Sequence, residues 1–315
     1  MTSECPMCGS QRASLLFRQT DRLYGTTDKQ FRVVQCSQCH LIRLDPRPSP
    51  EELCGYYPPD YWFAPGRSLA ARLEQWYRRA VLRGHVRFVA RALRESPARG
   101  PLLDVGCGGG LFLGMMRRRG FPVVGLDTSH AAAIAAWRHH RVTALVADLE
   151  HAPFRPGSFA GITMSHVLEH LSDPCVYLAA AYRLLAPNGR LIVFVPNAAS
   201  LQFAILGRRW NGLDVPRHLF DYRDRDVEQI LEMMGFAVLR RRYFSLRDNP
   251  AGMATSLAPG LDPMARRVRK LREGPVSRLA KDLAYFALTA AALPFTWVEA
   301  ALGAGSTVIL EARRI

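Results

Sequence analysis

A short apolar run that turns directly into a glycine-rich loop is the feature that most constrains the fold of this chain. Residues 101–105 read Pro-Leu-Leu-Asp-Val and predict a buried strand, and residues 106–110 read Gly-Cys-Gly-Gly-Gly. Residues 111–119 then predict a helix. A strand, a glycine turn and a helix N-terminus together form a corner of free backbone N–H groups that can hold a ligand. Glycines are needed there because the chain turns sharply and the ligand must approach bare backbone.

The spacing of the glycines discriminates between two kinds of nucleotide cofactor. The dinucleotide fingerprint GxGxxG requires glycine at position 111, where this chain has Leu111. The pattern present is DxGxGxG, which runs from Asp104 to Gly110. It is weak evidence for a pyrophosphate site and favours the smaller amino-acid end of S-adenosylmethionine.

Alternating strands and helices continue after the glycine loop and predict a parallel sheet. The second predicted strand ends at Asp127, about twenty residues past the loop, where a carboxylate can bind both ribose hydroxyls. The third ends at Asp148, which is placed to accept a hydrogen bond from an adenine amino group. Ligands of such sheets bind at the carboxyl ends of the strands. The predicted strands after the first cover residues 122–126, 142–147, 158–165, 190–195, 236–244 and 306–312.

Residues 101–197 resemble the class I S-adenosylmethionine-dependent methyltransferases. The segments LLDVGCGGG, GLDTS, ADLE, HVLEHLSDP and LLAPNGRLIVFVPN stand in the order expected for that family. The resemblance implies an α/β, Rossmann-like sheet of seven strands, with the glycine loop at the methionine end of the cofactor. It also implies Asp127 at the ribose, Asp148 at the adenine and His166 in the methyl-transfer pocket. The predicted cofactor-binding residues are Asp104, Gly106, Cys107, Gly108, Gly110, Asp127, Thr128, Asp148, Leu149, Ser165 and His166.

Two CxxC pairs near the N-terminus predict a structural zinc site. Cys5 and Cys8 form one pair, and Cys36 and Cys39 form the other. Two such pairs supply four thiolates to one ion and leave no position for a catalytic water. Short strands at 31–34 and 41–44 predict a small zinc-ribbon-like hairpin. This segment, and WNGLDVPRHLF at 210–220, resemble regions of bacterial deoxysugar C-methyltransferases and of methyltransferases encoded with surface-glycan pathways.

Four side chains are candidates for the chemistry. Methyl transfer is a displacement at a sulfonium carbon, so a base is needed only if the acceptor must lose a proton. His166, Glu169 and His170 follow the fourth strand, where the two histidines can instead pack against the rear of the cofactor. His218 lies beyond the fifth strand. We expect His218 to bind or deprotonate the acceptor.

The region before the last strand is predicted to be a helical insertion. It contains the basic residues Arg266, Arg267, Arg269, Lys270 and Arg272, followed by an apolar run at 283–298. Pro294 interrupts this run, which is too short for a confident transmembrane span. It can cover the active site, form a dimer face, or bring residues 265–300 to an anionic membrane and a lipid-linked acceptor.

The predicted organisation has four parts. They are a zinc-binding module at 1–60, a linker and helix at 61–99, a catalytic domain at 100–247 plus 304–315, and a helical insertion at 248–303. The N-terminus lacks the apolar region of a secretory signal, and the paired cysteines favour a reducing compartment. A cytoplasmic protein is therefore expected, with peripheral contact at the inner face of the membrane as the alternative.

Three functions remain open from the sequence. The first is methyl transfer to a small molecule or glycan, including a nucleotide- or lipid-linked sugar. The second is methylation of an rRNA base, because the formal charge is +15 and zinc modules also suit RNA. Against it, only three of the cationic residues are lysines, and HVLEH differs from the Asn/Asp-Pro-Pro-Tyr signature of many amino-group methylases. The third is a non-catalytic protein that binds the cofactor.

Overall fold

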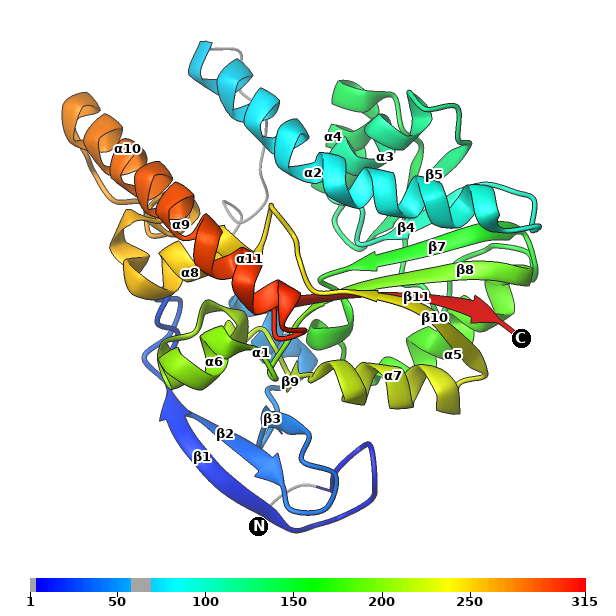
Figure 1. Cartoon of the computed structure of the whole chain (residues 1–315), viewed down its shortest axis with the longest axis horizontal. Helices are drawn as coiled ribbons and strands as arrows, with labels where there is room; N and C mark the ends of the chain where they lie inside the picture. The colour runs from blue at the N-terminus through cyan, green and yellow to red at the C-terminus, as the bar shows by residue number, and fades with distance from the viewer. Residues whose placement is uncertain (1–3, 58–68) are drawn as a thin grey trace.

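A computed structural model describes residues 4–57 and 69–315 and contains a seven-stranded sheet between layers of helices (Figure 1). The strand order is β10-β11-β8-β7-β4-β5-β6, in which β11 is antiparallel to both of its neighbours. This order confirms the predicted seven-stranded sheet. The strands are β4 (Leu102–Val105), β5 (Val123–Asp127), β6 (Ala144–Val146), β7 (Phe159–Ser165), β8 (Leu185–Pro196), β10 (Phe236–Arg242) and β11 (Thr307–Arg314).

The chain reverses its direction of travel across the sheet between β4 and β7. From β4 it moves outward through β5 to β6, and then returns to place β7 and β8 on the other side of β4. Loops at the carboxyl ends of β4 and β7 therefore diverge at a switch point, where α/β sheets bind their ligands. The glycine loop follows β4 and His166 follows β7.

Helices cover both faces of the sheet. Successive residues of each strand point to opposite faces, so each strand contributes side chains to both layers. Leu102 and Phe194 pack on one side with Val86 and Val89 of α2, whereas Leu103 packs on the other. In Figure 1 the first layer lies above the sheet and the second lies below it. The first layer contains α2 (Leu69–Glu95), α3 (Leu111–Arg117) and α4 (His130–His140), and the second contains α5 (Pro174–Leu184) and α7 (Asp224–Met233).

A second, antiparallel sheet forms the N-terminal module. The predicted hairpin is present as β2 (Phe31–Cys36) and β3 (Ile42–Leu44), and β1 (Ala13–Gln19) pairs with β2. The fourth strand, β9 (Phe220–Asp221), belongs to the segment after β8 and pairs with β3. The module is therefore completed by a strand from the catalytic part of the chain. The boundary predicted at residues 60 and 61 lies outside the described residues.

The segment between β10 and β11 is helical, as predicted. Glu299 and Gln202 form a buried hydrogen bond of 2.7 Å at its base, and Tyr285 lies 2.9 Å from Thr255 within it. The helices of this insertion are α8 (Asn249–Leu257), α9 (Pro263–Val268), α10 (Pro275–Ala291) and α11 (Leu293–Ala301). Together α10 and α11 form 27 residues that are long and apolar enough to cross a membrane by length and composition. The predicted apolar run at 283–298 lies within this helical stretch.

A buried ion-pair cluster joins the N-terminal module to the catalytic domain. Arg217 is fully buried and donates two hydrogen bonds of 2.9 Å to Asp21, one from each terminal nitrogen. It also pairs with Asp214 at 2.7 Å and donates to the carbonyl of Tyr56. Burial alone would raise the pKa of Asp21, but the hydrogen bonds and charge of Arg217 hold that pKa at about 2. The guanidinium stacks on Tyr24, 4.4 Å from the ring centroid.

Replacing Arg217 by methionine is expected to lower the free energy of unfolding by about 3–5 kcal/mol, because Asp21 and Asp214 would remain buried without their partner. Urea denaturation followed by circular dichroism measures this change. Arg18→Met, at an exposed arginine of β1, is the matched control and should leave the stability within about 0.5 kcal/mol. Equal stability of the two variants would show that the cluster does not hold the module in place.

Candidate active site

The glycine loop after β4 presents bare backbone toward open space. Gly106, Gly108 and Gly110 all have positive φ angles, of 70°, 51° and 74°. A Cβ added at Gly110 would lie 2.8 Å from the Cβ of Ala136 in α4, so this glycine permits close packing of the loop. A Cβ added at Gly108 would meet no atom within 4 Å. The backbone at Gly108 therefore borders the space into which a ligand can approach.

Two predicted carboxylates lie at or after the ends of the neighbouring strands β5 and β6. Asp127 accepts hydrogen bonds of 2.8 Å from the backbone N–H groups of Gly108 and Ser129, which fixes its position at the end of β5. Burial raises the pKa of Asp127. Asp148 follows β6 and accepts a 2.7 Å hydrogen bond from the hydroxyl of Tyr177 on α5. Tyr177 was not predicted from the sequence, where it reads as an ordinary helix residue.

The other predicted cofactor residues differ in exposure. Asp104 is buried and accepts a 2.6 Å hydrogen bond from Thr163, and burial together with the charge of Asp127 raises its pKa to about 7. Its carboxylate is therefore engaged inside the sheet. Cys107 and Leu149 are buried, Ser165 is half-buried and Thr128 is exposed.

The four predicted catalytic residues converge on one corner. His166 follows β7 with a φ of 54°, a left-handed backbone that is uncommon outside glycine. Glu169 and His170 belong to the 3-10 turn η2 (Leu168–His170), and His218 precedes β9. The rings of His170 and His218 meet edge to face with their centroids 4.6 Å apart. One carboxylate oxygen of Glu169 and one ring nitrogen each of His170 and His218 all lie within 4.8 Å of one another.

This corner adjoins the glycine loop. A Cβ added at Gly106 would lie 2.9 Å from a methyl group of Val167, the residue after His166. The backbone N–H of Leu219 donates to the carbonyl of Glu169 over 2.7 Å, which joins the segment carrying His218 to η2. The structure therefore brings the predicted cofactor loop and the predicted catalytic residues to the same edge of the sheet.

His166 lies between two carboxylates. Its Nδ1 is 3.2 Å from Glu169, and its Nε2 is 3.4 Å from Asp248 at the start of the helical insertion. Burial would lower the pKa of His166, but the two carboxylates outweigh it and raise that pKa to about 9. His166 is therefore an imidazolium at neutral pH and cannot accept a further proton there.

His170 and His218 are both oriented by backbone carbonyls. The Nδ1 atom of His170 lies 3.0 Å from the carbonyl of Arg217, and that of His218 lies 2.7 Å from the carbonyl of Gly212. Since a carbonyl only accepts, each Nδ1 carries a hydrogen, and in the neutral form of either ring the lone pair is on Nε2. Burial and the neighbouring His218 lower the pKa of His170 to about 4, which makes it a poor proton acceptor.

Sequence reasoning missed the residues that support this corner. Asp248 accepts a 2.5 Å hydrogen bond from Ser245, and Ser245 lies 2.8 Å from His85 of α2. The hydroxyl of Tyr57 lies 2.8 Å from Nδ1 of His170. The sequence around Asp248 is Asp-Asn-Pro before a helix, which is typical of a helix start and so carried no signal of a site.

The four predicted zinc ligands form a separate cluster in the N-terminal module. The Sγ atoms of Cys5 and Cys39 are 3.6 Å apart, as are those of Cys8 and Cys36. All four sulfur atoms lie within 4.8 Å of one another. Four sulfurs at about 2.3 Å from a tetrahedral ion would be about 3.8 Å apart, so the observed spacing fits such an ion.

Comparisons with known proteins place the fold in a family. A family model for a methyltransferase domain matches residues 74–241, more than half of the chain. The ubiquinone biosynthesis O-methyltransferase of Psychrobacter cryohalolentis is 30% identical over 200 residues, which cover 59% of this chain and 78% of that protein. The protein of the same name from Pseudomonas paraeruginosa is 32% identical over 130 residues. That match covers 39% of this chain, which spans only 56% of the length of the relative.

Solved structures agree on the fold. The crystal structure of a SAM-dependent methyltransferase from Archaeoglobus fulgidus superposes with a TM-score of 0.50 and 17% identity. The superposition covers 78% of this chain and 100% of the Archaeoglobus chain. At this identity the likeness concerns the fold alone. From the family match, the relatives and the sheet order, the chain belongs to the methyltransferase domain family and is an enzyme of the SAM-dependent class.

Proposed function

We propose that this enzyme transfers a methyl group to a hydroxyl of a small molecule or glycan, including a nucleotide- or lipid-linked sugar. The observation that carries the proposal is the orientation of His218, whose Nδ1–H is committed to the carbonyl of Gly212. In the neutral ring this leaves the Nε2 lone pair to take a proton from the acceptor. The O-methyltransferase names of the two sequence relatives support an oxygen acceptor.

S-adenosylmethionine, when bound, supplies an activated methyl group on a sulfonium and leaves as a neutral thioether. His218 accepts the hydroxyl proton while the new O–C bond forms and the C–S bond breaks. Glu169 and Asp248 flank the His166 imidazolium, and Arg247 lies 3.5 Å from Asp248, so the two carboxylates and the two cations together carry no net charge.

The glycine loop and two carboxylates fit this cofactor. Gly108 borders open space at bare backbone, and Asp127 is held against the same loop by the N–H of Gly108. Asp148 keeps the acceptor character needed at an adenine amino group, with Tyr177 fixing one of its oxygens. We assign the methionine, ribose and adenine ends of the cofactor to these three positions in turn.

We also propose a structural zinc ion bound by Cys5, Cys8, Cys36 and Cys39. Four protein thiolates close the coordination sphere, so the ion would stabilise the module and take no part in methyl transfer. The free energy of metal binding would then add to the stability of a module too small to have a large core of its own. A four-thiolate site requires reduced cysteines, which supports a cytoplasmic location.

Gly108→Ala is expected to weaken binding of S-adenosylhomocysteine at least about tenfold, since the new methyl group would enter the ligand space. Isothermal titration calorimetry measures the affinity. Gly157→Ala is the matched control, because Gly157 also has a positive φ, of 69°, and open space at its Cβ position. Both variants carry the same backbone strain of about 1–2 kcal/mol. Equal affinities would contradict the placement of the cofactor at Gly108, and no heat with the wild-type protein would contradict the proposed function.

His218→Ala is expected to reduce turnover by about 10²–10⁴-fold while S-adenosylhomocysteine still binds, because the acceptor proton would lose its base. Transfer of radiolabelled methyl groups into fractions of cell extract identifies the acceptor and measures the rate. His139→Ala, at an exposed histidine of α4, serves as the control. Unchanged turnover of the acceptor by the His218 variant would refute this assignment.

Metal analysis of the purified protein is expected to find one zinc ion per chain. Its removal by a strong chelator should lower the thermal midpoint, because the thiolates lose the ion that holds them together. Cys36→Ser should bind less zinc and melt at a lower temperature, whereas Cys54→Ser, at an exposed cysteine, should do neither. A protein that folds with the same midpoint in the presence of the chelator would exclude a structural ion.

A further inference from the structure

An exposed apolar face runs along the helical insertion. Val276, Leu279, Leu283 and Phe286 on α10 are 82%, 60%, 61% and 56% exposed. Their spacing of three, four and three residues places them on one side of the helix. The exposed residues Trp297, Val298 and Leu302 continue the apolar surface along α11 and just beyond it.

The opposite side of the same helices is fixed to the enzyme. Thr289 on α10 and Thr296 and Glu299 on α11 are buried. Glu299 accepts its hydrogen bond from Gln202, and Tyr285 contacts Thr255 of α8. A helix that crossed a bilayer would have to give up these contacts. The packing therefore favours helices that lie along the body of the enzyme with one apolar face outward.

The α2 helix adds to this surface. The ring of Tyr77 on α2 meets that of Phe286 on α10 edge to face, with centroids 5.7 Å apart. Leu73 and Trp76, near the start of α2, are 61% and 64% exposed. Figure 1 shows the first part of α2 and the first part of α10 projecting from the same side of the molecule. We call the exposed apolar residues of α2, α10 and α11 the apolar ridge; they are Leu73, Trp76, Val276, Leu279, Leu283, Phe286, Trp297 and Val298.

The charge around the first part of α10 is cationic. Residues 265–282 contain seven arginines and lysines and two acidic residues. Both acidic side chains are occupied by ion pairs, since Glu273 pairs with Arg266 and Lys281 and Asp282 pairs with Arg266. Arg272 and Arg278 are exposed and form no ion pair within the described part of the chain. The ridge is thus bordered by two cations, Arg272 and Arg278, that pair with no acidic side chain among the described residues.

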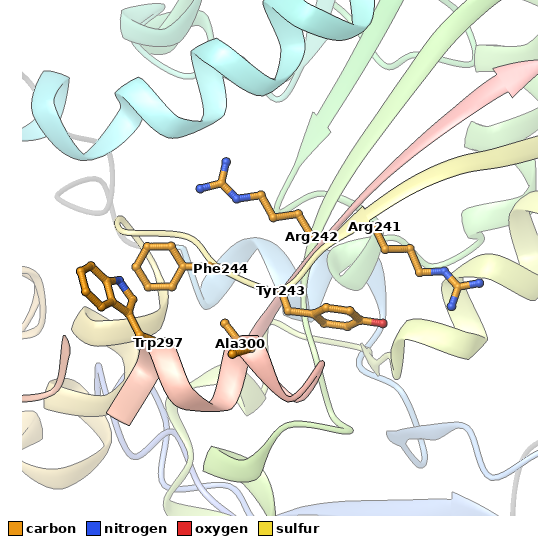
Figure 2. A pocket seen from close by; sticks show the side chains of 7 residues that line it. Arg241, Arg242, Tyr243, Phe244, Trp297 and Ala300 are labelled. Atoms are coloured by element: carbon orange, nitrogen blue, oxygen red, sulfur yellow. The ribbon is translucent and has the colours of Figure 1, made fainter. Parts of the chain in front are cut away.

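An open hollow of about 380 Å³ adjoins the α11 end of the ridge. Trp297 of the ridge and Phe244 line it with ring centroids 6.3 Å apart, and the side chain of Arg242 extends above them (Figure 2). None of its lining residues belongs to the predicted cofactor or catalytic set. Aromatic side chains with an arginine beside them are typical of the interface between hydrocarbon and headgroups.

We propose that the apolar ridge docks the enzyme onto a bilayer that contains anionic lipids. The apolar residues would enter the boundary of the hydrocarbon, while Arg272 and Arg278 would contact the headgroups. A second copy of this chain is the less favourable occupant, because the same cationic border would face itself across the interface. The inference does not depend on the identity of the methyl acceptor. It would bring the active site close to any acceptor held in the membrane.

Flotation of the full-length protein with vesicles tests the proposal. We expect the wild type to float with vesicles of mixed phosphatidylcholine and phosphatidylglycerol and to remain behind with phosphatidylcholine alone. Leu279→Glu combined with Leu283→Glu should abolish flotation, because two charges would enter the apolar face. Replacing Arg272 or Arg278 by glutamine should weaken binding to the anionic vesicles about fivefold for each arginine removed.

Met233→Glu, at an exposed apolar residue of α7, is the matched control and should float like the wild type. Thermal unfolding checks that all variants are folded. Sedimentation equilibrium without vesicles distinguishes the other occupant, since a dimer that dissociates in the double glutamate variant would assign the ridge to a second copy and overturn the proposal. A wild-type protein that fails to float with the anionic vesicles would also overturn it.

Discussion

The arrangement of the active site depends on the ion pairs of the buried Arg217 guanidinium. It binds Asp21 of the N-terminal module and Asp214 of the segment after β8, so it holds these two parts of the chain together. The backbone carbonyl of Arg217 orients His170, and the residue that follows Arg217 in the chain is His218. A desolvated cation is tolerated only with both carboxylates in place, which makes this contact selective for one geometry. The N-terminal module therefore acts as a frame for the histidines and contributes none of the four predicted catalytic side chains.

Three histidines in this corner differ in what they can do with a proton. His166 is held as a cation by Glu169 and Asp248, and burial keeps His170 neutral. The Nδ1–H of His218 is fixed by the carbonyl of Gly212, which is the orientation that the proposed acceptor of the proton requires. The histidines of the HVLEH segment are thus better suited to orienting groups and shaping the local charge. This division follows from the neighbours of each ring and could not be inferred from the residue type.

The sequence was informative where function imposes a local pattern. The glycine loop, Asp127, Asp148 and the cysteine pairs are each defined by spacing within a short segment. The structure has the loop after β4, Asp127 at the end of β5, Asp148 after β6 and the four cysteine sulfur atoms together. Alternating strands and helices predicted a parallel sheet, and the resemblance to the class I methyltransferases implied that it has seven strands. These features are visible because the backbone itself, or a turn of fixed length, determines where the side chains lie.

The features that were missed depend on contacts between distant segments. Arg217 and Asp21 are 196 residues apart, and neither stands in a pattern that points to the other. The strand β9 has only two residues and exists because it pairs with β3. Asp248 looks like a residue that begins a helix, and its role at His166 emerges only when the insertion places it beside the residue that follows β7. The protonation of His166 was unpredictable for the same reason, since one of its two carboxylates comes from that insertion.

The helical insertion links the chemistry of the site to the outer surface of the enzyme. Its first residues supply Asp248, and its last helix is closed at the base by Glu299, which lies 3.4 Å from Asn249 at the start. The two ends of the insertion meet at the neighbouring strands β10 and β11, so the insertion adds little strain to the sheet. The helices farther out do not have to pack within the core of the sheet. The residues at the foot of the insertion must preserve the charge balance around His166. The outer helices can expose an apolar face without disturbing that balance. Under the two proposals above, one segment would serve methyl transfer at its base and docking at its outer face.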